Sequence, residues 1–295
     1  EISECLVGSE MCIRDRCKAM NYKVHDNDII LYQPDFDLDE TLDCGQAFRW
    51  EKVQSEYDCT YSGYFLDRPL TISHDGDRFI LHNTSEEDFL NVWADYFDLS
   101  TDYGAVKIRL SADETLRKAC EFAGGIRLLK QDKWECLCSF IISQNNNIPR
   151  IKGIISRLCL HYGHFPSPSE LASETVESLG FLRSGFRAKY LIDAAEKTAD
   201  GSLELEAIPD MTIENARKRL MTIKGVGPKV AECVLLFGMY KTEAFPIDVW
   251  IKRVMDNYYP EGLPDEAKGI EGIAQQYLFH YIRNLEKSKK DTVTA

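Results

Sequence analysis

The sequence predicts an α+β fold, with an N-terminal antiparallel β-sheet domain followed by an all-helical body. Up to about residue 83, apolar residues alternate with polar ones, and an Asp-Gly-Asp turn stands at 75–77. Alternation with such turns is typical of β-hairpins. Beyond Gly124 the apolar residues instead recur three and four positions apart, as in amphipathic helices. The 295 residues, 44% of them hydrophobic, suffice for about two domains with buried cores.

The strand-like part lies between Asp28 and Asn83, and it predicts a sheet of about four to six strands. Residues 85–97 then change to helical spacing, with Ser85 as the expected N-cap ahead of three acidic residues. The segments expected to be strands are 29–33, 47–53, 59–66, 69–73 and 78–83.

The helical part is interrupted by short breaks rich in Gly, Pro and Ser, such as 165–169 and 224–228. No long flexible linker separates it from the sheet, so we expect the two parts to pack closely. We divide the chain into a leader that is disordered or not native (1–19), an antiparallel β domain with flanking helices (20–125) and a helical body (126–295). The segments expected to be helices in the body are 132–143, 147–161, 168–179, 187–199, 212–222, 229–239, 247–258 and 269–284.

The net charge of -13 is unevenly distributed along the chain. Residues 1–125 hold 12 Lys and Arg against 26 Asp and Glu, whereas residues 126–295 hold 23 against 22. Within the second part, 126–153 and 211–255 are locally basic. Salt screens charges beyond about 10 Å, so a local basic patch can bind phosphate on an acidic protein. The overall charge therefore does not exclude a nucleic acid partner.

The ten cysteines predict neither a disulfide framework nor a metal site. Their density is low, no C-x-x-C or H-E-x-x-H motif occurs, and no cysteine follows Cys233. No secretion signal stands at the N-terminus, so we expect reduced thiols in the cytoplasm or nucleoid of a bacterium or the nucleus of a eukaryote. No uncharged apolar run reaches about 18 residues, so no membrane span is expected.

The segment 220–233 joins two amphipathic helices through a hairpin that contains Gly225 and Gly227. Two glycines allow a sharp turn and close approach of another molecule, and Pro228 suits the first turn of the following helix. Amide groups at such a helix N-terminus attract phosphate. From the glycine content alone, an ordinary connection between two helices is an equally good interpretation.

Lys229 and Asp248 are the candidate catalytic residues. Lys229 falls in the first turn of the helix after the hairpin, where the helix dipole disfavours a positive charge, and an uncharged amine is a nucleophile. Asp248 follows an apolar loop and directly precedes another amphipathic helix. It is therefore also an expected N-cap, and a carboxylate held in this way is rigid and ionised.

The stretches K-G-V-G-P-K-V-A (224–231) and F-P-I-D-V (245–249) resemble the helix-hairpin-helix GPD superfamily of DNA glycosylases, which is named for its Gly/Pro-rich loop and Asp. A lysine at 229 resembles those members that are also lyases. Further stretches resemble the 8-oxoguanine DNA glycosylases in particular, and the resemblance runs from about residue 28 to 284. These stretches are 45–50, 125–132 and 143–150.

This resemblance implies a bifunctional repair enzyme, a DNA N-glycosylase and abasic-site lyase that flips 8-oxoguanine out of damaged double-stranded DNA. Lys229 would attack C1′ of the deoxyribose while Asp248 stabilises the cationic sugar, and the resulting Schiff base would permit β-elimination. No redox cofactor or catalytic metal is implied, although in relatives the hairpin carbonyls, here at 223–228, hold a monovalent cation. We expect the protein to act as a monomer.

The resemblance also implies contacts with DNA. Asn145 and Phe186 match the residues that fill the vacated stack, with Phe186 in place of the tyrosine usual in vertebrate members. Arg150 and Arg187 match the arginines that read the widowed cytosine. Phe186 could instead belong to the core, and either arginine could contact a phosphate or form a surface ion pair. The further expected DNA contacts are Gly225, Gly227 and Lys252.

For the base pocket, Phe279 and Cys233 match the two residues that sandwich the damaged base. Cys233 lies one helical turn beyond Lys229 and so on the same side. Gln275 matches the residue that hydrogen-bonds the pairing edge. Gly45 matches the glycine whose carbonyl accepts the N7 proton of 8-oxoguanine, and guanine would leave that acceptor unpaired at about 1–3 kcal/mol. Gln275 and Phe279 could also be ordinary positions of a C-terminal helix.

Trp250 departs from the family pattern, because vertebrate relatives carry a phosphate-contacting histidine there. Lys252 and Arg253 could compensate. Two alternatives remain. A sister glycosylase for another base is one, although endonuclease III-like relatives usually carry four cysteines after the hairpin helix. A non-catalytic DNA-binding module is the other, and the presence of both Lys229 and Asp248 argues against it.

Overall fold

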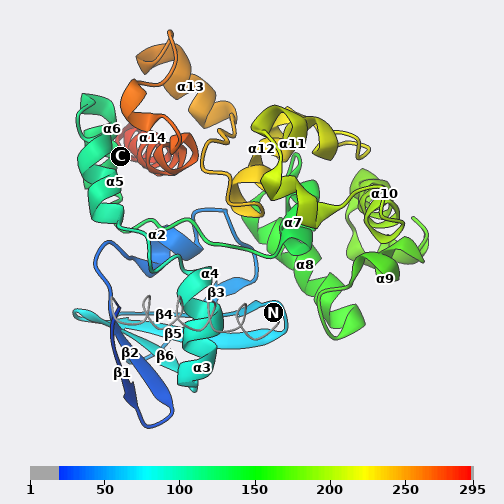
Figure 1. Cartoon of the computed structure of the whole chain (residues 1–295), viewed down its shortest axis with the longest axis horizontal. Helices are drawn as coiled ribbons and strands as arrows, with labels where there is room; N and C mark the ends of the chain where they lie inside the picture. Colours follow the sequence, from blue (N-terminus) through cyan, green and yellow to red (C-terminus); the bar gives the residue numbers. More distant parts are fainter. Residues whose placement is uncertain (1–19, 294–295) are drawn as a thin grey trace, which may run out of the picture.

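The computed structural model describes residues 20–293, with side chains up to residue 285, and the expected leader at 1–19 lies outside this range. The described chain begins with a six-stranded antiparallel sheet (Figure 1), ordered β1-β2-β6-β5-β4-β3. The predicted N-terminal antiparallel sheet is therefore confirmed. Its strands are β1 (Asn21–His25), β2 (Asp28–Tyr32), β3 (Trp50–Lys52), β4 (Cys59–Phe65), β5 (Arg68–Asp75) and β6 (Arg78–His82).

Strand β1 was not predicted. It lies before the strand-like segment that begins at Asp28, and although Tyr22 and Val24 alternate with polar residues, the strand is almost entirely exposed. The inner strands do alternate: in β2, Ile29 and Leu31 are buried, and they pair with Leu81 and Phe79 of β6. These residues form an apolar face of the sheet, and Ile80 of β6 is buried on the opposite face.

A short helical segment covers the apolar core of the sheet. It runs through α3 (Glu86–Asp88), the π-helical turn η1 (Phe89–Trp93) and α4 (Ala94–Tyr96). Ser85 caps it as predicted, because its side chain accepts a hydrogen bond from the Asp88 amide. Trp93 is buried beside Trp50, with ring centroids 6.3 Å apart. Aromatic rings thus form much of this first core.

The chain beyond residue 124 is helical, as predicted. Among the described residues, no helix combines the length and apolar composition that crossing a bilayer requires. The helices outside the sheet cover are α2 (Leu38–Leu42), α5 (Tyr103–Leu110), α6 (Glu114–Phe122), α7 (Lys133–Ser143), α8 (Ile148–Tyr162), α9 (Pro168–Ala172), α10 (Ala188–Ala199), α11 (Ile213–Leu220), α12 (Pro228–Phe237), α13 (Val249–Tyr258) and α14 (Glu271–Val293). The short 3-10 turns are η2 (Ser178–Leu182), η3 (Gly185–Arg187), η4 (Leu205–Asp210) and η5 (Asp265–Ala267).

The expected single helix over 168–179 is wrong. The chain leaves the helix after Ala172, and a separate 3-10 turn begins at Ser178. Between them, Thr175 and Ser178 bond each other's backbone amides through their hydroxyls. Such side chains offer the backbone an alternative to helical hydrogen bonds, which ends the helix early.

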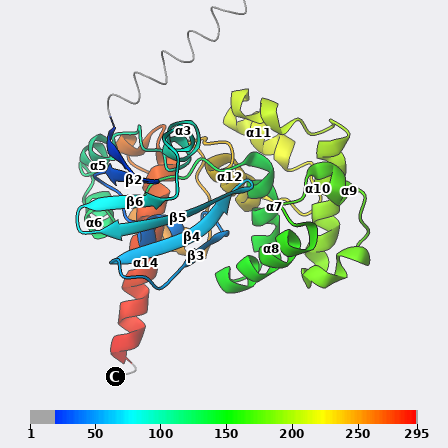
Figure 2. The same ribbon diagram turned by 90° about the horizontal axis from the view of Figure 1, so that it is seen from below.

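Helices α5 and α6 lie before residue 126 in the chain but pack with the helical body. Helix α6 packs against α14, and α5 packs against α6 and the turn η5 (Figures 1 and 2). Their buried residues, including Tyr103, Leu110 and Leu116, belong to the same apolar core as Leu137 and Leu278. The chain therefore crosses from the sheet core to the helical core near Tyr103.

Arg127 joins the two cores. Its guanidinium is 1% exposed and donates to the carbonyls of Pro34, Asp35 and Asp98 at 3.1, 3.0 and 2.7 Å. It also lies 4.6 Å from the ring centroid of Tyr103. One side chain thus satisfies three carbonyls from two loops of the sheet domain, in one buried and two partly buried hydrogen bonds.

Replacing Arg127 with methionine should lower the free energy of unfolding by about 3 kcal/mol or more, because each buried acceptor left without a donor costs about 1–3 kcal/mol. Urea unfolding followed by fluorescence measures this change. The matched control is Arg117→Met, which removes only an exposed pair with Glu121 and should cost less than about 1 kcal/mol. Equal losses in the two variants would contradict this role of Arg127.

Candidate active site

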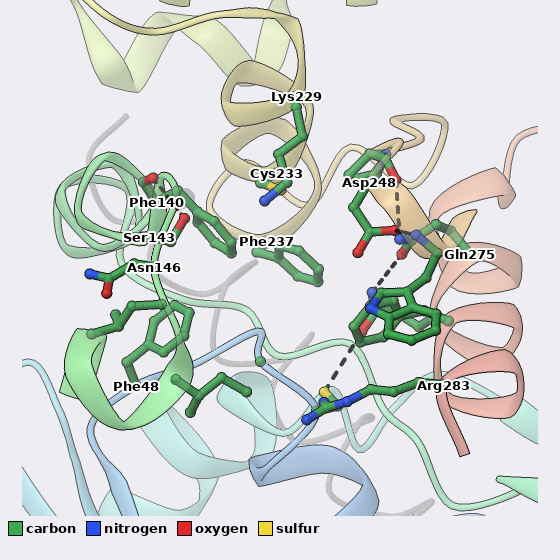
Figure 3. A pocket seen from close by; sticks show the side chains of 18 of the residues that line it. Phe48, Phe140, Ser143, Asn146, Lys229, Cys233, Phe237, Asp248, Gln275 and Arg283 are labelled. Carbon is green, nitrogen blue, oxygen red and sulfur yellow. Dashed lines mark hydrogen bonds between the residues drawn. The ribbon is translucent and has the colours of Figure 1, made fainter. Parts of the chain in front are cut away.

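A cavity of about 400 Å³ opens where the sheet domain meets the helical body (Figure 3). Its walls come from the loop before β3, the junction of α7 and α8, helix α12, the loop before α13, and α14. The residues that the sequence assigned to catalysis and to the base pocket all line it. They are Lys229, Asp248, Gly45, Cys233, Gln275 and Phe279.

Stacked aromatic rings make one side of this cavity apolar. The rings of Phe140 and Phe237 stack with centroids 5.3 Å apart, and Phe48 meets Phe140 edge-on at 5.8 Å. Lys229 Nζ lies 5.8 Å from the centroid of Phe140. The cavity therefore offers flat apolar surface with one amine at its edge, which suits a planar ring.

Helix α12 places Lys229 and Cys233 on the same wall. Pro228 is its first residue, as predicted, so Lys229 falls in the first turn and Cys233 one turn later. Burial raises the pKa of the Cys233 thiol to about 11, although the charge of Lys229 acts in the opposite direction. The cysteine is therefore a neutral thiol near pH 7 and a poor nucleophile. The exposed Lys229 remains the candidate.

Asp248 caps α13, as predicted. Its Oδ1 accepts hydrogen bonds from the amides of Trp250 and Ile251 at 2.9 and 2.8 Å. In Figure 3 its carboxylate points into the cavity that Lys229 also enters. The hydrogen bonds to Oδ1 thus fix the Asp248 side chain, and its carboxylate faces the cavity.

Glu232 connects the walls of the cavity that carry Lys229 and Asp248. Its role was not predicted from the sequence. This side chain is 8% exposed. It accepts from the Phe245 amide at 2.8 Å and from Arg217 Nε of α11. Glu232 lies three residues after Lys229, so it ties α12 to the loop that leads into Asp248. A carboxylate on the buried face of a helix was the available signal.

Gly45 lies in the loop between α2 and β3 with φ +92°, a conformation that favours glycine. The next residue, Gln46, is buried and fixes this loop. Its Nε2 donates to the carbonyls of Thr41 and Arg127 at 2.9 and 2.8 Å, and its Oε1 accepts from the Leu129 amide at 2.9 Å. Gln46 falls within the stretch 45–50 that resembles the 8-oxoguanine DNA glycosylases, but no role was predicted for it from the sequence.

Helix α10 supports the hairpin between α11 and α12. Gly225 has φ +77°, and a Cβ there would lie 2.3 Å from the ring of Tyr190. Asp193 accepts from the Lys224 amide at 2.7 Å. Lys197 Nζ donates to Asp193 and to a hairpin carbonyl, both at 2.6 Å. Side chains of α10 therefore hold the hairpin backbone in place.

The expected wedge residues, Asn145 and Phe186, are both exposed, and Arg187 links their loops. Asn145 has φ +47° after the end of α7, and the Phe186 side chain is 46% exposed. The buried guanidinium of Arg187 donates to the carbonyls of Gln144, Asn145 and Ser184 at 2.8, 3.0 and 3.0 Å. The exposure of Phe186 does not fit a core role. Arg187 is engaged with backbone in this arrangement.

Arg150 and Lys252 are exposed and do not line the cavity. Arg150 Nη2 lies 3.5 Å from the Arg183 carbonyl. Trp250 does line the cavity, and the Arg253 guanidinium lies 5.0 Å from the centroid of its ring. The departure at position 250 therefore changes the wall of the cavity itself.

The part of the chain that the structure describes contains no group of three or more His, Cys, Asp or Glu side chains placed to hold a metal ion. In the hairpin, the Ile223 carbonyl accepts from the Val226 amide at 3.1 Å. Backbone carbonyls are the groups that this hairpin could offer to a monovalent cation.

Two family models together match most of the chain. Residues 28–137 match the N-terminal domain of 8-oxoguanine DNA glycosylase, and residues 138–277 match the HhH-GPD superfamily of base excision DNA repair proteins. The chain is 32% identical over 257 residues to the N-glycosylase/DNA lyase of Saccharomyces cerevisiae, covering 75% of this chain and 68% of that protein.

Solved structures are similar over nearly their whole length. MBOgg1 in complex with a low-affinity DNA ligand is 41% identical, with a TM-score of 0.85 and coverage of 90% of this chain and 99% of that one. The 8-oxoguanine glycosylase/lyase of Clostridium acetobutylicum, in complex with double-stranded DNA containing cytosine opposite 8-oxoG, is 35% identical. Its TM-score is 0.80, with 90% of this chain and 98% of that chain covered.

Substituting alanine for Gly225 should lower the free energy of unfolding by about 2 kcal/mol or more, since a positive φ is strained for alanine and the Cβ would overlap Tyr190. Thermal or urea unfolding measures it. Gly227→Ala is the matched control, because Gly227 has φ -97° and no atom within 4 Å of a built Cβ. A control variant as unstable as Gly225→Ala would contradict the explanation.

Proposed function

Because the chain belongs to the 8-oxoguanine DNA glycosylase family of the HhH-GPD superfamily, we propose that it is a bifunctional N-glycosylase and DNA lyase that excises 8-oxoguanine from double-stranded DNA. The observation that supports the proposal is that Lys229 and Asp248 line the same cavity as the four residues expected to hold the base. Its volume lies within the roughly 300–1,000 Å³ of small-ligand sites.

The damaged base would leave the duplex and enter this cavity. Flipping costs about a few kcal/mol of stacking and pairing, and the exposed Asn145 and Phe186 would fill the gap. Phe279 and Cys233 would hold the two faces of the base, and the Gly45 carbonyl would accept its N7 proton. Guanine lacks that proton, so it would leave the acceptor unpaired at about 1–3 kcal/mol.

The orphaned cytosine would be read by arginine. Arg150 is exposed, and its planar donor groups suit the acceptors that cytosine exposes when guanine leaves. Arg187 would reach the cytosine only after releasing the carbonyls of Gln144 and Asn145. The hairpin amides near Gly225 and Gly227, with Lys252, would contact phosphates.

The chemistry would take place at the mouth of the cavity. The uncharged Lys229 amine would form a bond to C1′ as the bond from C1′ to the base breaks and its electrons leave with the base. Asp248 would stabilise the positive charge on the sugar. Loss of the amine proton and ring opening would give a Schiff base. Removal of a C2′ proton would then expel the 3′ phosphate.

A monovalent cation would fit the hairpin carbonyls at 223–228, where it would orient the amides toward a phosphate. The chain's own residues already do part of this work, because Asp193 and Lys197 fix the hairpin backbone. No step of the proposed reaction depends on the cation.

Borohydride trapping tests the proposal. With a duplex that carries one 8-oxoguanine opposite cytosine, the wild-type protein should form a covalent adduct that Lys229→Gln does not form. The reason is that borohydride reduces only a Schiff base, and the glutamine amide cannot form one. Denaturing gels measure the adduct.

Duplex affinity provides the control, since Lys229→Gln should bind the same DNA within about threefold. Base release without an adduct would show a glycosylase whose nucleophile is not Lys229. Neither release nor adduct would favour a DNA-binding module, and an adduct on a different damaged base would favour a sister glycosylase.

Glu232→Ala should slow single-turnover base release by about 10- to 100-fold, because small misplacements of catalytic groups have effects of this size. Duplex affinity should stay nearly unchanged. Glu232→Gln should recover part of the rate, since its amide oxygen can still accept from the Phe245 amide. The exposed Glu214 of α11 gives a matched control, Glu214→Ala, and a similar loss there would contradict this positioning role.

A further inference from the structure

A chain of hydrogen bonds runs along the buried wall of the cavity. Gln275 Nε2 donates to the Pro246 carbonyl at 3.1 Å, and Gln276 Nε2 donates to Gln275 Oε1 at 2.6 Å. The Cys44 thiol lies 3.7 Å from Gln276 Oε1. All of these residues line the cavity, and both glutamines are 4% exposed. Of these residues, only Gln275 was predicted from the sequence to have a role.

The donor and acceptor roles in this series of hydrogen bonds are set by the Pro246 carbonyl. The Pro246 carbonyl can only accept, so the nitrogen of the Gln275 amide must face it, and the oxygen must face Gln276. Gln276 must then present its own nitrogen, because two facing oxygens would repel. Its oxygen is left for Cys44, whose single proton is shared with the Thr41 carbonyl at 3.4 Å. Burial raises the pKa of Cys44 to about 11, so this proton is present.

An amide side chain can rotate by 180° at little cost unless its two ends have different partners. Here each end of Gln275 has one partner, which leaves one lone pair of Oε1 and one proton of Nε2 for the cavity. Their order along the wall is therefore set. Guanine-type bases present N–H donors at N1 and N2 beside the acceptor O6. Adenine-type bases present the opposite order, with a donor at N6 and an acceptor at N1.

We propose that Gln276 is a specificity-determining positioning residue, which together with the Pro246 carbonyl holds the Gln275 amide in the orientation that accepts a guanine-type edge and rejects an adenine-type edge. This inference rests on the proposed function of the same cavity and extends it to a residue that is held behind the base-contacting side chain. Cys44 supports the lock from the other end.

Gln276→Glu is the decisive variant. It replaces the donor that faces Gln275 Oε1 with a carboxylate oxygen. The Gln275 amide would then meet a repelling oxygen in either orientation, at residue 276 or at the Pro246 carbonyl, and would no longer be held in one of them. Single-turnover release is measured on duplexes that carry 8-oxoguanine or 8-oxoadenine, and borohydride trapping is measured on a duplex with an abasic site. The ratio of 8-oxoguanine to 8-oxoadenine release should fall by about tenfold or more. Trapping at the abasic site should change less than about twofold, because no base is read there.

Two further variants separate the lock from general damage to the cavity. Gln276→Met, which is similar in size and removes both polar groups, should lower the ratio less than Gln276→Glu does. Cys44→Ser keeps a donor and should preserve the ratio. An unchanged ratio in Gln276→Glu, or equal losses on all three duplexes, would overturn the proposal. A wild-type protein that traps at abasic sites but releases no 8-oxoguanine would instead overturn the proposed function.

Discussion

Buried backbone amides and carbonyls must find hydrogen-bond partners, and around this cavity many of the partners are buried side chains. Several walls of the cavity are loops, which cannot satisfy their own backbone as helices do. Each loop is therefore tied to a neighbouring element by one polar side chain, and its position depends on that tie. Gln46 binds the loop before β3, Glu232 the loop before α13, Asp193 the hairpin and Arg187 the loop after α7.

Features that depend on local sequence could be predicted. The strands and most of the helices follow from the spacing of apolar residues, and the caps at Ser85 and Asp248 follow from side chains suited to a helix start. Lys229 and Cys233 share a face because they lie four residues apart on one helix. The predicted helix over 168–179 was wrong after Ala172. The hydroxyl hydrogen bonds that end the helix there are local too, but they leave the spacing of apolar residues unchanged, so the spacing gives no sign of them.

Features that depend on distant partners could not be predicted from spacing. Glu232 meets Phe245 and Arg217 only after the chain folds, and Gln276 meets Cys44 across most of the sequence. A polar residue on a buried helix face signals that a partner exists without saying which one. The grouping of Gly45 with α12 and α14 came from family resemblance, since no periodicity links those segments.

The residues proposed to contact the base and those proposed to act at the sugar or the duplex differ in their exposure to solvent. The side chains proposed to read the base, Gln275 and Cys233, are almost fully buried, whereas Lys229 and the wedge residue Asn145 are exposed. This division matches a flipped nucleotide, because its base would lie in the enclosed part while its sugar stays at the mouth near the duplex. A buried side chain that contacts the base can distinguish one base from another more strongly, since an unpaired polar group costs most where water is excluded. Full burial of the nucleophile would shield it from the sugar that it must attack.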